Sequence, residues 1–200
     1  MIKLFDQSYP FPILLASTSI YRQEQLKTLG YKFEVDSADV DEDQYKKNNL
    51  SAKELSAQLA ILKASSLAKK YPQHLIIGAD QVCHLYGTIF SKPLTLEKAV
   101  DQLKLLQGKK HCLTTSMCVH FKGKNNLHTD ETFLTMRTLS QDEIASYLKL
   151  DNPLKCAGSY MFESHGQRLF SQIQSSDPSS ILGLPMMALQ TILLQLANEA

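Results

Sequence analysis

Short apolar runs alternate with segments of helical periodicity in the first half of the chain, and this alternation restricts the fold more than any other feature. Residues Pro12–Ala16 and Leu75–Ala79 are apolar runs with the length of buried strands. The residues between these runs predict a helix over 21–29, a strand over 31–36 and a long helix from the capping box Ser51-x-x-Glu54 to about Tyr71. Strands that alternate with helices in this way are typical of α/β proteins.

The second half of the chain carries signals of antiparallel strands. Gly123-Lys-Asn-Asn126 separates two strand-like segments and has the turn chemistry of a hairpin, and Gly87 has the same position in a shorter hairpin. Further elements are predicted as helices over 95–107, over 140–150 and after Pro185, short strands near Cys156 and over 169–173, and a loop over 38–49. We therefore expect a single α/β domain over residues 1–200, with a mixed central sheet flanked by helices and two lobes around a cleft.

The composition is that of a globular protein, with 44% hydrophobic residues, 20% charged residues and a net charge of +1. A general nucleic-acid binder would show a clustered basic excess and a membrane protein would show longer apolar runs, so we expect neither nucleic acid nor membrane as a partner. The four cysteines lack zinc-finger and CxxC spacing, and the N-terminus lacks the apolar core of a signal peptide. These features predict a cytoplasmic protein with reduced thiols.

Asp80 and Lys63 are candidate functional residues because of their positions at the end of a predicted strand and on the apolar face of a predicted helix. Asp80 follows the apolar run Leu75–Ala79, and ligands of open α/β sheets bind beyond the carboxyl ends of strands, so Asp80 either faces a ligand or only turns the chain. Lys63 shares a helical face with Leu59 and Leu67. A lysine on such a stripe either reaches an anion or snorkels from the edge of the stripe to water.

Three further segments carry polar groups that suit phosphate or cation binding, although each group also has a common structural role. Ser17, Ser19 and Arg22 bring hydroxyls and a cation to a predicted helix N-terminus, where serines are also ordinary helix caps. Lys92 precedes a helix and Glu42 lies in an acidic loop, and either side chain could simply be solvated. Together these residues supply cations, carboxylates and hydroxyl groups at the ends of predicted elements, a combination that suits phosphoryl chemistry on a metal-bound triphosphate.

A series of short motifs runs through nearly the whole chain, from Ile13 to about Leu196. The motifs are, in order, Leu15-Ala-Ser-Thr-Ser19 with Arg22, Val40-Asp-Glu42, Lys63-Ala64, Ile76-Ile-Gly-Ala-Asp-Gln81, Ser91-Lys-Pro93, Cys156-Ala-Gly-Ser159 and Ile181-Leu-Gly-Leu-Pro185. In this order they resemble the motifs of the Maf-like nucleotide pyrophosphatases, which are structural relatives of the inosine triphosphate pyrophosphatases. The resemblance implies the same fold and the hydrolysis of a nucleoside triphosphate to a monophosphate and pyrophosphate.

The resemblance also implies roles for the matching positions. Asp80 corresponds to the catalytic base that activates water, and Glu42 corresponds to an acidic partner of the metal or the water. The cations that hold the phosphates correspond to Arg22, Lys63 and Lys92, and the contacts to the phosphate end correspond to Ser17 and Ser19. Glu42 and Asp80 are thereby expected to hold a divalent cation, Mg²⁺ or Mn²⁺.

Within the family, three positions bear on which base is bound. Tyr21, Gln81 and Glu163 resemble the aromatic residue, Gln and Glu of the branch that hydrolyses 7-methyl-GTP, whereas Arg, Thr and Gln are expected in the dTTP and UTP branch. Gln23 stands where the family usually has a second arginine. Two alternatives therefore stay open, a pyrophosphatase for dTTP, UTP or another modified nucleotide, and a regulator of cell division that binds nucleotides without turnover. The sequence is also compatible with a homodimer.

Overall fold

The computed structural model describes residues 3–6, 8–46 and 49–199. Its strands are β1 (Ile13–Ala16), β2 (Phe33–Asp36), β3 (Leu75–Leu85), β4 (Thr88–Phe90), β5 (Lys110–Phe121), β6 (Lys124–Met136) and β7 (Phe170–Gln174). Its α-helices are α1 (Ile20–Lys27), α2 (Glu42–Lys46), α3 (Ala52–Ser66), α4 (Leu96–Leu106), α5 (Gln141–Asp151) and α6 (Met186–Asn198). Three short 3₁₀ helices are η1 (Ala157–Ser159), η2 (His165–Leu169) and η3 (Pro178–Leu182).

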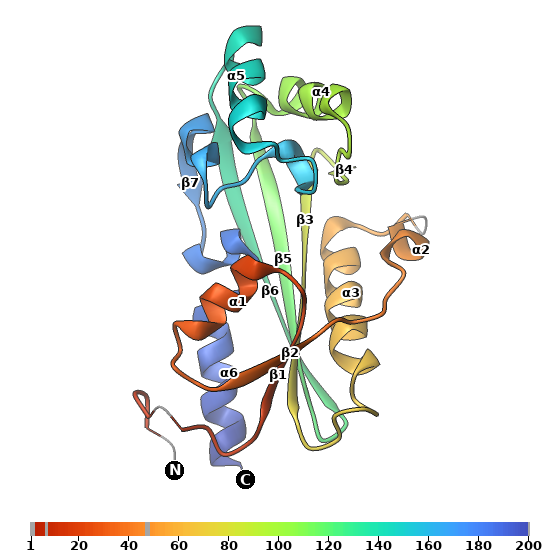
Figure 1. The fold of residues 1–200 in the computed structure, drawn as a ribbon, viewed down its shortest axis with the longest axis vertical. Coiled ribbons are helices and arrows are strands. Elements are labelled where there is room, and N and C mark those ends of the chain that lie inside the picture. The colour runs from red at the N-terminus through yellow and green to blue at the C-terminus, as the bar shows by residue number, and fades with distance from the viewer. Residues whose placement is uncertain (1–2, 7, 47–48, 200) are drawn as a thin grey trace.

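The strands form one mixed sheet in the order β2-β1-β3-β5-β6-β7, with β4 paired to β3. Strand β1 is parallel to both β2 and β3, and the other pairs are antiparallel. The long strands β3, β5 and β6 run along the molecule and connect its two ends (Figure 1). Helices α1, α3 and α6 surround one end with β1 and β2 and form a first lobe, and α4 and α5 lie at the other end with β4 and β7 and form a second lobe (Figure 1).

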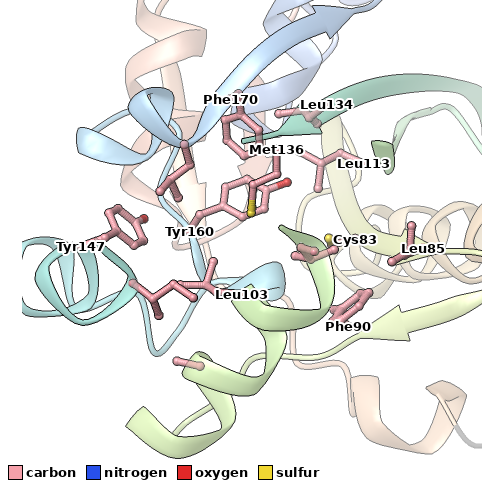
Figure 2. Packing of buried hydrophobic residues seen from close by; sticks show 14 of the residues in the cluster. Cys83, Leu85, Phe90, Leu103, Leu113, Leu134, Met136, Tyr147, Tyr160 and Phe170 are labelled. Carbon is pink, nitrogen blue, oxygen red and sulfur yellow. The ribbon is translucent and has the colours of Figure 1, made fainter. Parts of the chain in front are cut away.

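Each lobe has its own hydrophobic core. In the first lobe, α1 and α6 pack their leucines on one face of the sheet, and α3 packs Leu55 and Leu59 on the other. In the second lobe, Tyr160 and Phe170 meet edge to face at 4.9 Å between ring centroids and pack among side chains of α4, α5 and the sheet (Figure 2). Fully burying a large apolar side chain contributes about 1.5–3 kcal/mol to folding.

Among the described helices, none combines the length and the apolar character that crossing a membrane requires.

Helix α3 lies very close to β3 because β3 has a glycine at the contact. A Cβ atom on Gly78 would lie 2.5 Å from both the carbonyl oxygen of Ala60 and the backbone nitrogen of Ala64. The backbone of α3 therefore rests directly on β3, and the fully buried methyl groups of Ala60 and Ala64 leave room for this approach. The contact fixes the height of α3 above the sheet and, with it, the position of Lys63.

One edge of β3 changes partner along its length, and the change leaves a gap. Residues Leu75–Ile77 pair with β1, and residues Cys83–Leu85 pair with β4. Between these two ladders, no strand in the described part of the chain pairs with that edge, whereas the other edge pairs with β5 from Ile76 to His84. Asp80 lies in the middle of the gap, at the junction of the two lobes.

The structure confirms the predicted fold class, the two capping boxes and the hairpin turn at Gly123. Four local predictions are wrong. The long helix that was expected to reach about Tyr71 ends at Ser66. Residues 38–49 contain helix α2, although residues 47–48 lie outside the described residues. The segment at Cys156 leads into η1 instead of a strand, and Gly158 within η1 has a φ of 77°. Strand β3 does not end at Ala79, because β5 continues to pair with it through Asp80 and beyond.

Replacing Gly78 with alanine tests the contact between α3 and β3. The added methyl group would meet backbone atoms of α3, so we expect the free energy of unfolding, measured in urea, to fall by about 1–3 kcal/mol. Gly123→Asn is the control, because an added Cβ there meets nothing within 4 Å and asparagine tolerates the positive φ of 77°. A Gly78→Ala protein as stable as the wild type would show that α3 does not rest on β3.

Candidate active site

A cleft of about 940 Å³ lies between the lobes, along the unpaired edge of β3. It is walled by the β1–α1 connection and α3 of the first lobe and by the segments around β4 and η1 of the second. The structure brings all of the predicted site residues to this cleft. Those that line it are Ser17, Ser19, Tyr21, Arg22, Glu42, Lys63, Asp80, Gln81, Lys92 and Glu163.

Lys63 connects two carboxylates at the floor of the cleft. Its Nζ lies 2.7 Å from Asp80 Oδ1 and 2.7 Å from Glu42 Oε1. The side chains of Lys63 and Asp80 are only 12% and 10% exposed, and that of Glu42 is 30% exposed. Of the two alternatives for Lys63, the structure supports contact with anions, because the ammonium group ends among carboxylates and not in open water.

Asp80 is the most deeply buried acid of this group. Burial raises the pKa of its carboxyl group, the nearby Lys63 and Arg22 oppose that rise, and the charge of Glu42 adds to it. Asp80 and Glu42 meet the same ammonium group, so oxygen atoms from two carboxylates converge on one centre of positive charge. Carboxylate oxygens are the ligands that Mg²⁺ and Mn²⁺ prefer, so this donor set fits such an ion.

Arg22 is anchored by backbone carbonyls. Its Nε donates to the Gly183 carbonyl at 3.1 Å, and its Nη1 donates to the Ala79 carbonyl at 2.8 Å. The Ala79 carbonyl belongs to the gap in β3, so the missing strand neighbour is replaced by a guanidinium group. Gly183 has a φ of 102°, and a Cβ there would lie 2.9 Å from Arg22 Nε, so the close approach requires glycine. Burial lowers the pKa of Arg22, and the charges of Asp80 and Glu42 oppose that shift.

The N-terminus of α1 lines the cleft. Ser19 caps the helix and accepts a bond from the Arg22 backbone nitrogen at 3.5 Å. The buried Ser17 hydroxyl accepts from the Ser19 backbone nitrogen at 3.2 Å and lies 3.5 Å from Arg22 Nη1. Backbone N–H groups, hydroxyls and a guanidinium group therefore converge at one helix N-terminus, which favours an anion.

Tyr21 and Glu163 face each other across the cleft, from α1 and from the segment before η2. Burial raises the pKa of Tyr21, and the charge of Glu163 and a hydrogen bond to its carboxylate raise it further. Lys92 lies on the same side as Glu163 and is exposed, and its charge acts on the Cys156 thiol. The Gln81 side chain is held by η3, because its Nε2 donates to the Ser180 carbonyl at 2.9 Å and to the Ile181 carbonyl at 3.2 Å.

The support of the segment that carries Glu163 is a part of the site that the sequence does not predict. Asp151, the last residue of α5, has a side chain only 1% exposed. It accepts bonds from Ser164 Oγ at 3.0 Å and from the His165 backbone nitrogen at 3.1 Å, and its Oδ1 lies 2.6 Å from His165 Nδ1. Burial opposes the ionisation of Asp151, but the side-chain hydrogen bonds from His165 and Ser164 outweigh it and lower its pKa. No spacing in the sequence links Asp151 to residues 164–165, so only the fold reveals the contact.

Known proteins match this chain over nearly its full length. A family model described as Maf-like protein matches residues 12–196. A protein of Bdellovibrio bacteriovorus (strain HD100) named 7-methyl-GTP pyrophosphatase is 42% identical over 181 residues, which are 90% of this chain and 95% of that protein. The solved structure of the Staphylococcus aureus Ham1 protein has a TM-score of 0.52 at 17% identity and covers 92% of this chain and 98% of its own, which is a likeness of fold alone. The predicted family is thus confirmed, and this chain belongs to the Maf-like proteins.

Proposed function

We propose that this protein is a nucleotide pyrophosphatase that hydrolyses 7-methyl-GTP to 7-methyl-GMP and pyrophosphate. The observation that carries the proposal is the Asp80–Lys63–Glu42 group at the floor of a cleft whose wall holds Arg22 and a helix N-terminus. The 42% identity to a protein named 7-methyl-GTP pyrophosphatase supports the same activity and substrate.

The phosphate groups occupy the first-lobe side of the cleft. Arg22, Lys63 and the N-terminus of α1 gather positive charge there, and Ser17 and Ser19 add hydroxyl groups. Lys92 reaches the phosphates from the second lobe. Because Arg22 is already fixed by the Gly183 and Ala79 carbonyls, it stabilises developing negative charge with little reorganisation.

Asp80 orients the attacking water and accepts its proton. Burial raises the pKa of this carboxyl group, and the charges of Lys63 and Arg22 oppose that rise. Glu42 and Asp80 would hold a divalent cation, Mg²⁺ or Mn²⁺, which would stabilise negative charge on the phosphate oxygens. Lys63, which lies between the two carboxylates, has a flexible side chain whose ammonium group can also reach the phosphates.

The base stacks on Tyr21 and turns its edge to Glu163, in place of the hydrogen bond between these two side chains. A guanine methylated at N7 carries a delocalised positive charge, so its ring gains electrostatic attraction when it stacks on an aromatic face. The N1–H and exocyclic amine of guanine are two donors on one edge, and the Glu163 carboxylate can accept both. Asp151 holds the segment of Glu163 in place.

A cytoplasmic location suits such an enzyme, because the four cysteines of this protein are free thiols.

Asp80→Asn tests the assignment of the base. The amide keeps the shape of the side chain but cannot accept a proton, so we expect pyrophosphate release to fall at least about a hundredfold in a folded protein. Asp130→Asn is the matched control, because Asp130 is also buried, at 4% exposure, but lies outside the cleft and should retain turnover. Near-normal release by Asp80→Asn would rule out Asp80 as the base.

Lys63→Met tests whether the lysine serves both the fold and the reaction. The variant leaves the buried Asp80 carboxylate without its nearest cation, so we expect a loss of about 3 kcal/mol in the free energy of unfolding, together with loss of turnover. The double variant Lys63→Met/Asp80→Asn should recover part of the stability but none of the activity, since it removes the unpaired charge as well. Turnover that persists in Lys63→Met would limit the lysine to a structural role.

Glu163→Gln tests how guanine is recognised. A glutamine accepts through only one oxygen, so we expect the preference for 7-methyl-GTP over UTP to fall about tenfold while kcat for UTP changes little.

Asp151→Asn should reduce the same preference, because it releases the segment that carries Glu163. In the Glu163→Gln background, Asp151→Asn should add little further loss. If the two losses simply add, Asp151 does not act through Glu163.

A further inference from the structure

A second group of metal-ligand side chains lies on the sheet, outside the cleft. His84 on β3, Cys112 on β5 and Glu131 on β6 each offer one ligand atom, and these atoms all lie within 4.8 Å of one another. None of the three residues lines the cleft. The mechanism proposed above does not use them.

The strand register places these side chains on one face of the sheet. His84 pairs directly with Cys112 across β3 and β5, and Thr114 pairs directly with Glu131 across β5 and β6. Cys112 and Thr114 are two residues apart on the same strand, so all four side chains point to the same side. Since backbone ladders of adjacent strands fix these positions, the group does not depend on a flexible loop.

The donors form a nitrogen, sulfur and oxygen set. Imidazole, thiolate and carboxylate together are typical ligands of Zn²⁺ and related borderline ions, whereas Mg²⁺ and Mn²⁺ favour oxygen donors such as those of the cleft. Ligand atoms around a tetrahedral Zn²⁺ lie about 3.5 Å apart, given bonds of about 2.0–2.3 Å. A small movement of the exposed Glu131 side chain closes the remaining distance.

The surroundings of the group supply both support and access. The fully buried Thr114 hydroxyl lies 3.0 Å from His84 Nε2 and 3.7 Å from Cys112 Sγ, so it contacts two of the three donor side chains. Such contacts behind the ligands commonly tune metal sites. Cys112 is buried, His84 is partly buried and Glu131 is exposed, which leaves a path from solvent to the donors.

We propose that His84, Cys112 and Glu131 bind one borderline divalent metal ion, with Zn²⁺ as the best match, and leave a fourth position open to water. Binding breaks the S–H bond of Cys112, releases its proton to solvent and forms a metal–sulfur bond. The ion would join the three long strands that the two lobes share, and would thereby stabilise the fold.

Cobalt binding to the full chain tests the site, because Co²⁺ bound to a thiolate gives a charge-transfer band in the near ultraviolet that oxygen ligands do not give. We expect one such site per chain after treatment with a chelator, displaced by Zn²⁺ and unaffected by excess Mg²⁺. Cys112→Ser should abolish the band. His84→Asn and the exposed Glu131→Gln should weaken Co²⁺ binding at least about tenfold.

Two controls separate this site from the cleft. Cys156→Ser removes the thiol that lines the cleft, and Asp80→Asn removes a carboxylate of the proposed catalytic ion, so the band should survive in both variants. This outcome does not depend on whether the pyrophosphatase proposal holds. Absence of the band at saturating Co²⁺, its survival in Cys112→Ser, or unchanged affinity in Glu131→Gln would overturn the proposed site.

Discussion

The contact between α3 and β3 at Gly78 is the constraint on which the rest of the site depends. A side chain at this position would collide with the backbone of α3, at the Ala60 carbonyl and the Ala64 nitrogen. Because the helix rests directly on β3 at Gly78, the Lys63 side chain extends along this strand, and its Nζ lies 2.7 Å from Asp80 Oδ1. The same lysine then contacts Glu42 of α2, so one helix–strand contact aligns residues from three segments of the chain.

The gap in the edge of β3 explains why a ligand site forms here. Where β1 ends and β4 has not begun, one edge of β3 pairs with no strand in the described part of the chain, and the two lobes separate there. Arg22 satisfies the Ala79 carbonyl in this gap, and Asp80 lies beside it. The proposed phosphate contacts come mainly from the first lobe, and Glu163 comes from the second, so β3, β5 and β6 set the distance between the two ends of the bound nucleotide.

The sequence was informative where a pattern is local. Both capping boxes, the turn at Gly123 and the strands β1 and β7 form where the periodicity and turn residues predicted them. The end of β3 was misplaced because the apolar run stops at Ala79, whereas pairing with β5 continues. Asp80 is therefore a residue within a strand whose other edge is open, and an apolar pattern carries no information about a change of strand partner.

The candidate site was predicted as a set of residues, but its geometry was not. All ten positions line one cleft, yet no pattern indicated that Lys63 joins Asp80 to Glu42 or that Asp151 holds residues 164–165. The bond from Arg22 to Gly183 spans 161 positions, and it explains why a glycine is needed there. Contacts of this kind depend on the folded arrangement of distant segments and have no local signature.

The most direct test of the account is steady-state turnover of the wild-type protein with Mg²⁺ or Mn²⁺, measured as pyrophosphate and monophosphate released from 7-methyl-GTP, GTP, UTP and dTTP. The account predicts pyrophosphate and nucleoside monophosphate in equal amounts, and the highest kcat/KM for 7-methyl-GTP. Release of orthophosphate in place of pyrophosphate would contradict the proposed reaction. A higher kcat/KM for UTP or dTTP than for 7-methyl-GTP would contradict the proposed recognition of the base by Tyr21 and Glu163.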